Sequence, residues 1–246
     1  MPDVAVLFLA ACGTALATGL GAVPVFYLGA RTAQLTPALL GFAAGVMGVA
    51  AVAGLIVPAF EEGSTASVAA GLLVGGLLLV LARRHLDPDV HFFGRSGPSA
   101  RTSALVFLVL FVHSLPEGFA LGSAFASDRS GLSLFVILAI AIQNIPEGTS
   151  VAIPMAAAGF SRRRQFWTAV ATSAPQPLGA LVAFFLVEQI SALLPFSLAF
   201  AAGAMLVLIA IEMLPDAFAS GTRLGPVLGF VAGAAVMLGL SFALGV

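Results

Sequence analysis

Long apolar stretches separated by short polar breaks divide this chain into eight segments. Each stretch holds about 20 or more residues, which is the length that an α-helix needs to cross the hydrocarbon core of a bilayer. The pattern predicts an all-α integral membrane protein with eight transmembrane helices. The predicted spans are residues 4–30, 36–60, 64–84, 102–127, 131–158, 163–189, 195–218 and 223–245.

The basic residues are all arginines, and they gather on one side of this arrangement. Nine of the ten lie at the connections after the first, third, fifth and seventh spans, whereas the opposite connections hold only Arg129. Arginine and lysine concentrate in the cytoplasmic loops of membrane proteins. We therefore expect the arginine-rich side to be cytoplasmic, with both termini outside, in a bacterial cytoplasmic (inner) membrane. The one long polar break, residues 85–101, is then a cytoplasmic loop.

Composition agrees with the hydropathy pattern and excludes several classes of protein. The chain is 60% hydrophobic and 9% charged, and its net charge of -1 gives no basis for binding nucleic acid. Cys12 is the only cysteine, so one chain cannot form a disulfide or a thiolate metal cluster. The first residues lack the basic start of a signal peptide, and we expect them to begin the first span.

The second and seventh spans share a short sequence. Gly-Phe-Ala-Ala-Gly-Val-Met at 41–47 matches Ala-Phe-Ala-Ala-Gly-Ala-Met at 199–205, in spans that run in opposite directions through the membrane. Inverted repeats of this kind are typical of transporters, which place their site at the repeat interface. The alternative is that both runs are stripes of small residues that allow close helix packing.

The fourth and fifth spans each contain one version of a polar phrase. His-Ser-Leu-Pro-Glu-Gly occupies 113–118 and Gln-Asn-Ile-Pro-Glu-Gly occupies 143–148. Ionisable side chains inside a membrane span are costly and usually functional. Pro116 and Pro146 are also expected to break the helical hydrogen bonding, which a membrane helix tolerates where it lines a cavity.

Each phrase places two polar side chains on one helix face. His113 and Glu117 are four residues apart, as are Gln143 and Glu147, and residues at this spacing are neighbours on a helix. The two spans are joined by a short connection and are therefore antiparallel neighbours. We predict that an imidazole, an amide and two carboxylates meet at one depth, as a cation site. The alternative is a polar bridge between helices.

The chemistry of these groups favours a divalent transition metal. Two carboxylates match a double positive charge, and imidazole favours zinc over magnesium or calcium. We expect Zn²⁺ as the substrate, with Cd²⁺, Fe²⁺ and Mn²⁺ left open, and no organic cofactor. An intramembrane metalloenzyme is the competing hypothesis, but the chain has no His-Glu-x-x-His phrase and no spare base or nucleophile, so we predict that it is not an enzyme. A metal-sensing membrane protein also stays open.

The two phrases, together with the runs at 41–47 and 200–205, resemble the ZIP (Zrt/Irt-like) family of divalent-metal transporters, most of all its GufA-type branch. The resemblance implies a single transmembrane domain over 1–246 in a 3+2+3 inverted-repeat arrangement, with metal moving into the cytoplasm. The implied parts are a first three-helix unit at 1–84, the loop at 85–101, the central helices at 102–158 and a second three-helix unit at 159–246.

The resemblance also implies a centre for two metal ions. The first ion falls to His113, Glu117, Gln143 and Glu147, and the second shares the two glutamates and adds Asn144. Two departures weaken the second position. Ser114 stands where the family usually has asparagine, and Gln176 where relatives often have glutamate. We expect one firm position and one weak or vacant one.

Lesser candidates lie outside the central phrases. Glu212 and Asp216 are expected on the exit route. Met47 is placed near the outer entrance by the resemblance, although filling the core is the simpler interpretation. The expected partners are divalent metal ions and the lipid bilayer, and the small residues of the third span are compatible with a homodimer.

Overall fold

The computed structural model describes residues 2–85, 94, 97–127, 129, 131–219, 221 and 223–246. Over these residues the chain is helical and contains no strand. Eight helical spans in this part are long and apolar enough to cross a membrane, which confirms the predicted number. The spans are Val4–Leu28, Thr32–Glu62, Thr65–Arg84, Pro98–Phe125, Leu132–Ala157, Arg162–Gln189, Ser191–Phe218 and Leu224–Leu244.

The predicted ends of the spans are wrong by at most four residues. The fourth span begins at Pro98 rather than at 102, because proline suits the first turn of a helix, where its missing N–H is not needed. The predicted loop at 85–101 is shortened accordingly, and most of it lies outside the described residues.

Four spans are single α-helices, and four are divided. The single helices are α5 (Thr65–Arg84), α6 (Pro98–Phe125), α7 (Leu132–Ala157) and α12 (Leu224–Leu244). The divided spans consist of shorter pieces. These are α1 (Pro2–Leu20) with α2 (Val23–Leu28) and η1 (Gly29–Arg31); α3 (Thr32–Val49), η2 (Ala50–Ile56) and α4 (Val57–Glu62); α8 (Arg162–Thr172) and α9 (Pro175–Gln189); and η3 (Ser191–Leu193), α10 (Leu194–Leu208), η4 (Ile209–Met213) and α11 (Leu214–Phe218).

Pro116 and Pro146 lie inside continuous helices, so the hydrogen bonds that they are predicted to break do not end either helix. Helices α6 and α7 continue through both prolines. Packing against neighbouring helices can accommodate a proline within a membrane helix without ending it. The sixth span does end a helix at a proline: α8 stops at Thr172 and α9 begins at Pro175.

Two segments of π-helix occupy matching places in the second and seventh spans. Segment η2 begins three residues after the run at 41–47, and η4 begins four residues after the run at 199–205. A π segment carries a wider turn than an α-helix and often marks a functional site. The shared irregularity supports the internal repeat beyond the matching letters.

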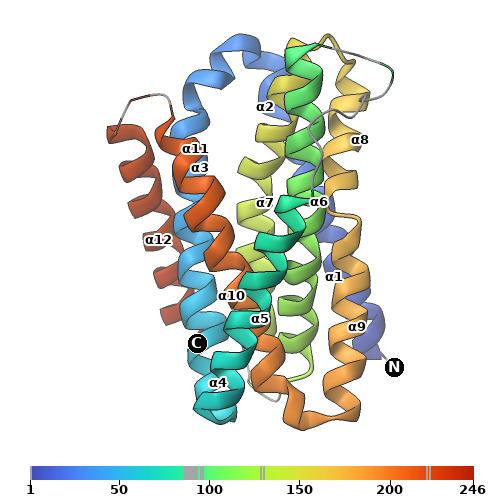
Figure 1. The fold of residues 1–246 in the computed structure, drawn as a ribbon, viewed down its shortest axis with the longest axis vertical. Coiled ribbons are helices and arrows are strands. Elements are labelled where there is room, and N and C mark those ends of the chain that lie inside the picture. The colour runs from blue at the N-terminus through green and yellow to red at the C-terminus, as the bar shows by residue number, and fades with distance from the viewer. Residues whose placement is uncertain are drawn as a thin grey trace.

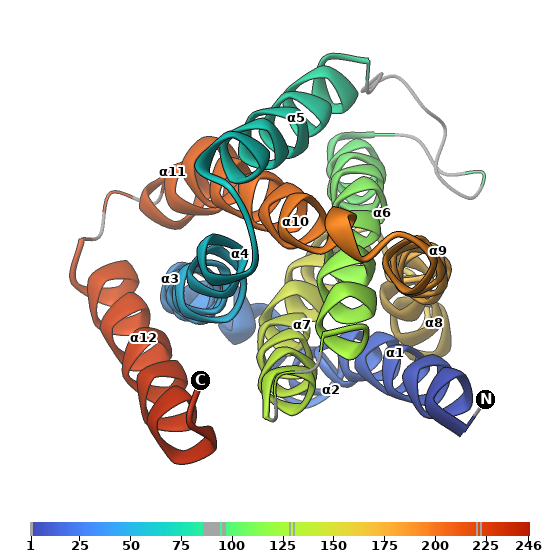
Figure 2. The same cartoon turned by 90° about the horizontal axis from the view of Figure 1, so that it is seen from below.

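The helices pack in four close pairs, and the pairs are related to one another by the inverted repeat. Helix α3 packs on α12, α5 on α10, α6 on α9 and α1 on α7 (Figure 2). If the first three spans are exchanged with the last three, and the fourth with the fifth, each pair maps onto another pair. The two three-helix units are therefore interlocked, since the second span packs on the eighth and the seventh on the third.

Glycines let the backbones of these pairs touch. A Cβ atom added at Gly75 of α5 would lie 1.9 Å from the Phe200 carbonyl oxygen of α10, and one at Gly148 of α7 would lie 1.7 Å from the Thr18 carbonyl oxygen of α1. Small residues at such contacts are typical of membrane helices. The glycine face of α5 is thus used inside the molecule, and it gives no support to the predicted homodimer.

The two ends of the molecule differ in what they carry. Both termini lie toward the lower half of the bundle in Figure 1, whereas α2, α11 and the first turns of α8 lie at the upper end. The upper end is the one to which the arginine-rich connections belong. The main hydrophobic cluster between the two ends contains apolar side chains from all eight spans.

Candidate metal centre

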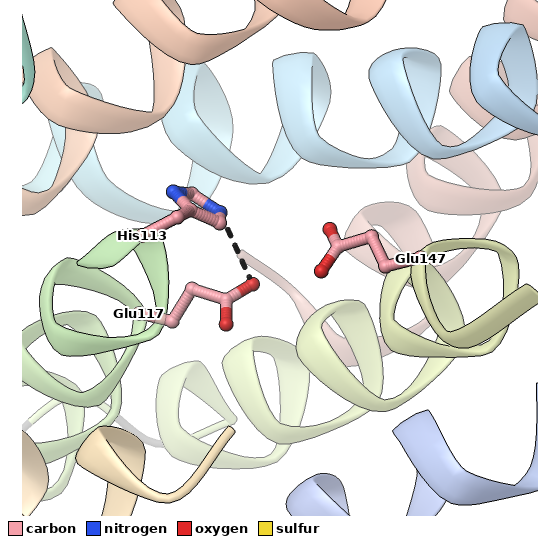
Figure 3. Close-up of side chains that lie close together, drawn as sticks. All are labelled: His113, Glu117 and Glu147. Carbon is pink, nitrogen blue, oxygen red and sulfur yellow. Dashed lines mark ion pairs between the residues drawn. The ribbon is translucent and has the colours of Figure 1, made fainter. Parts of the chain in front are cut away.

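Three buried side chains from α6 and α7 point toward one another in the middle of the bundle (Figure 3). Each of His113, Glu117 and Glu147 offers a ligand atom, and these atoms all lie within 4.8 Å of one another. His113 and Glu117 are fully buried, and Glu147 is 4% exposed. The predicted meeting of the two phrases at one depth is therefore present in the structure.

The four-residue spacing produces the contact within α6. Nε2 of His113 lies 3.4 Å from Oε1 of Glu117. From α7, the Nε2 atom of Gln143 donates a hydrogen bond of 2.5 Å to the same carboxylate oxygen. All four side chains that the sequence assigns to the first metal position therefore belong to one cluster.

Several polar atoms of this cluster have no hydrogen-bond partner in the protein. They are both ring nitrogens of His113, Oε2 of Glu117, Oε1 of Glu147 and Oε1 of Gln143. Leaving a buried polar atom without a partner costs free energy, and each such atom calls for an explanation. A metal ion that accepts electron pairs would give a partner to one ring nitrogen of His113 and to the oxygens of Glu117, Glu147 and Gln143.

The two glutamates give the same indication through their charge. Among the described residues, the arginine ion pairs involve Glu61, Glu62 and Glu212, and none reaches Glu117 or Glu147. Two carboxylates this close in a low-dielectric interior repel each other. Both stay ionised only where a cation lies nearby; otherwise the pair holds a proton. The pair is therefore suited to a divalent cation.

The side chains predicted for a second ion are placed differently. Asn144 donates from Nδ2 to the Thr14 carbonyl oxygen at 2.8 Å and to Oε1 of Gln176 at 3.5 Å. Gln176 donates from Nε2 to the Thr14 hydroxyl at 2.6 Å. Ser114 donates its hydroxyl to the Leu110 carbonyl oxygen at 2.9 Å. These groups bind protein atoms, although the Oδ1 atom of Asn144 has no partner.

The sequence interpretation missed the contribution of the first span. Thr14 joins Asn144 to Gln176, and the Thr18 hydroxyl lies 2.7 Å from that of Ser173 in the break between α8 and α9. The signal available was the pair of threonines four residues apart in an apolar span, which puts both hydroxyls on one face.

A cavity of about 340 Å³ joins the cluster to the arginine-rich end. Glu147 and Ser150 line its inner part, and Thr36 and Thr102 line it near the starts of α3 and α6. The predicted exit residues Glu212 and Asp216 also line it. Glu147 therefore contacts both the central cluster and the route out of it.

Met47 is placed apart from the polar cluster's ligand atoms. It is fully buried and belongs to the main hydrophobic cluster. Its position at the end of the repeated run in α3 gives it a packing role in the structure.

Comparison with known proteins agrees with the resemblance seen in the sequence. Residues 95–241 match the family model described as ZIP zinc transporter. The chain is 36% identical to the zinc transporter GufA of Myxococcus xanthus, over 93% of this chain and 95% of that protein. This chain belongs to the ZIP family. The predicted GufA-type character is thereby confirmed.

Other members of the ZIP family extend the comparison. The chain is 37% identical to the zinc transporter ZIPB of Bordetella bronchiseptica, over 93% of this chain and 78% of that protein. It is 39% identical to an Arabidopsis thaliana protein whose name describes a zinc transporter, over 83% of this chain. The chain spans only 33% of the length of that plant protein.

Proposed function

We propose that this chain carries Zn²⁺, or a closely related divalent cation, across a membrane into the cytoplasm. The observation that carries the proposal is the buried cluster of His113, Glu117 and Glu147, in which both ring nitrogens and one oxygen of each carboxylate have no hydrogen-bond partner in the protein. The ZIP relatives named as zinc transporters support the same conclusion. Their names also favour a transporter over the intramembrane metalloenzyme.

The proposed binding step uses one set of four ligands. His113 supplies an imidazole nitrogen, Gln143 an amide oxygen, and Glu117 and Glu147 supply carboxylate oxygens that balance the two positive charges. Gln143 would release its hydrogen bond to Glu117 and turn its unpartnered oxygen toward the ion. The set contains no thiolate, so its affinity for the metal suits an ion that must also be released.

The proposed release step follows the cavity. Glu147 is both a ligand and a lining residue, so an ion can pass from the centre into the cavity without losing every protein oxygen at once. Glu212 and Asp216 offer the next carboxylates toward the arginine-rich end. The direction of transport rests on that end being cytoplasmic.

The same geometry supports one ion rather than two. Asn144, Ser114 and Gln176 are uncharged, and each already donates a hydrogen bond to a protein atom. A second divalent ion would gain no further negative charge from these groups. Cd²⁺, Fe²⁺ and Mn²⁺ remain candidate substrates because their ligand preferences overlap those of zinc.

We further propose a single transmembrane domain in a bacterial cytoplasmic membrane, with both termini outside. The apolar side chains that cover the outer faces of α5 and α12 would contact lipid acyl chains. A homodimer is compatible with this arrangement.

Uptake by the purified protein tests the proposal. Proteoliposomes loaded with a zinc-sensitive dye are compared for the wild type, His113→Ala and Glu147→Ala. Matched controls are His85→Ala and Glu188→Ala, which replace the same residue types at exposed positions outside the cluster. We expect both cluster variants to lose most of the uptake and both controls to retain it. Wild-type rates in both cluster variants would show that the site is assigned wrongly.

A further inference from the structure

An arginine from α5 contacts the wall of the 340 Å³ cavity that the proposed release step follows, which we call the exit cavity. The Nε atom of Arg83, in the last turn of α5, lies 3.2 Å from Oε2 of Glu212. Its Nη1 atom donates a 2.8 Å hydrogen bond to the Ile211 carbonyl oxygen. Arg83 therefore holds both the backbone and the acidic side chain of the π segment η4.

Glu212, in the π segment η4, lines two cavities. Glu212 lines the 340 Å³ cavity together with Glu147 and Asp216. With Arg83 it also lines a small recess beside Val112, the residue that precedes His113 in α6. An ion that leaves the central cluster thus meets the carboxylate of Glu212 while that carboxylate is paired with a guanidinium.

Charge decides what Glu212 can do to such an ion. Without a neighbouring cation, Glu212 and Asp216 would present two negative charges to the cavity, the same total as Glu117 and Glu147 present in the centre. The Glu212 side chain is only 20% exposed, so solvent screens its charge incompletely. A pair of oxygen ligands with that charge would hold a divalent ion instead of passing it on.

We propose that Arg83 is a positioning residue for release: it neutralises Glu212 and so prevents the exit cavity from retaining the transported ion. The inference rests on the proposed function, because it concerns the route by which the metal leaves. Arg83 acts through Glu212 and does not touch the metal. Its always-charged guanidinium is suited to this role, since it cannot lose its proton to the cavity.

The effect should be moderate, because the Arg83 side chain is 46% exposed. For an ion pair this open to water, we expect retention in the cavity to tighten by about fivefold when the arginine is removed. In Arg83→Gln, the maximal uptake rate and the KM should therefore fall together by about that factor. The dissociation constant for zinc in the cavity should fall by the same factor.

Four variants separate this role from a merely structural one. Arg83→Gln removes the charge, Arg83→Lys keeps a charge at the same position, and Arg83→Gln with Glu212→Gln removes both partners. Arg84→Gln is the matched control, because Arg84 is the exposed next residue and forms no ion pair with any residue that the structure describes. Zinc binding is measured by equilibrium dialysis, and uptake by proteoliposomes with a zinc-sensitive dye.

The expected pattern is about fivefold tighter zinc binding in the cavity of Arg83→Gln only, with wild-type affinity in the other three. Unchanged affinity and unchanged kinetics in Arg83→Gln would overturn the inference. A loss of zinc from the central cluster would also overturn it, because that result indicates a structural role. If the wild type takes up no zinc, the proposed function fails, while the dialysis result still decides whether Arg83 weakens zinc binding in the cavity.

Discussion

Glu117 and Glu147 approach each other in the interior of the bundle, and the side chains around them differ in how they can respond to that charge. His113 and Gln143 have unpartnered atoms beside the two carboxylates. Asn144 and Gln176 both donate hydrogen bonds to Thr14. At the residue scale, we propose that the number of bound ions is limited by the neutral amides of Asn144 and Gln176, which occupy places where carboxylates would attract a second cation.

Restoring a charge there should create a second metal position. In the double variant Ser114→Asn with Gln176→Glu, we expect the zinc bound per chain to rise from one ion to two. The new carboxylate adds a negative charge, and the asparagine adds an oxygen one residue after His113. Zinc content measured by elemental analysis of the purified protein checks this expectation.

Gln165→Glu is the matched control for that experiment. Gln165 is a buried glutamine of α8 whose Nε2 donates to the Phe160 carbonyl oxygen, away from the cluster. It should not change the zinc content. If the double variant still binds one ion, Ser114 and Gln176 do not limit the second position.

At this scale the sequence predicted which side chains of the fourth and fifth spans meet, and it missed partners from the first and third spans. A four-residue spacing fixes the neighbourhood of His113 and Glu117 by helix geometry alone. The roles of Thr14 and Arg83 depend on contacts with residues more than 100 positions away, and no local pattern encodes those contacts. Their discovery required the packed structure.

At the scale of elements, hydropathy predicted which segments form helices but not where the helices change character. The wide turns of η2 and η4 have the same apolar composition as the α-helices that flank them, so periodicity cannot distinguish the two forms. The effect of a proline on a helix also depends on its surroundings. Pro116 and Pro146 are accommodated by their neighbours, whereas Pro175 begins a new helix.

The close helix pairs make a prediction about stability. In Gly75→Ala, the new methyl group would lie 1.9 Å from the Phe200 carbonyl oxygen, so α5 and α10 must separate. Overpacking of this kind typically costs about 1–3 kcal/mol. We expect a lower melting temperature in detergent, measured by thermal unfolding of the purified protein.

Gly239→Ala provides the comparison for this prediction. Gly239 lies within α12, and a Cβ atom there would meet nothing within 4 Å. Alanine favours a helix over glycine by roughly 1 kcal/mol, so this variant should melt at or above the wild-type temperature. Equal melting temperatures for the two variants would contradict the glycine-mediated contact.

For the whole molecule, the position of the cavity and the distribution of the arginines both distinguish one end of the helix bundle from the other. The exit cavity leads to the end where nine arginines belong, and the tenth, Arg129, lies at the other end. Arg129 forms ion pairs with both Glu61 and Glu62 at the end of α4. The asymmetry rests on the count of basic residues, and one arginine against nine leaves it intact.

Reporter fusions should therefore give a clear orientation. Alkaline phosphatase is active only outside the cytoplasm, and green fluorescent protein becomes fluorescent inside it. We expect an active phosphatase after Val246, and a fluorescent but phosphatase-inactive fusion after Gly159, in the connection beside three arginines. The charge difference between the ends drives this outcome, so it should survive Arg129→Gln. The reverse reporter pattern would place the cavity's open end outside and would turn the proposed uptake into export.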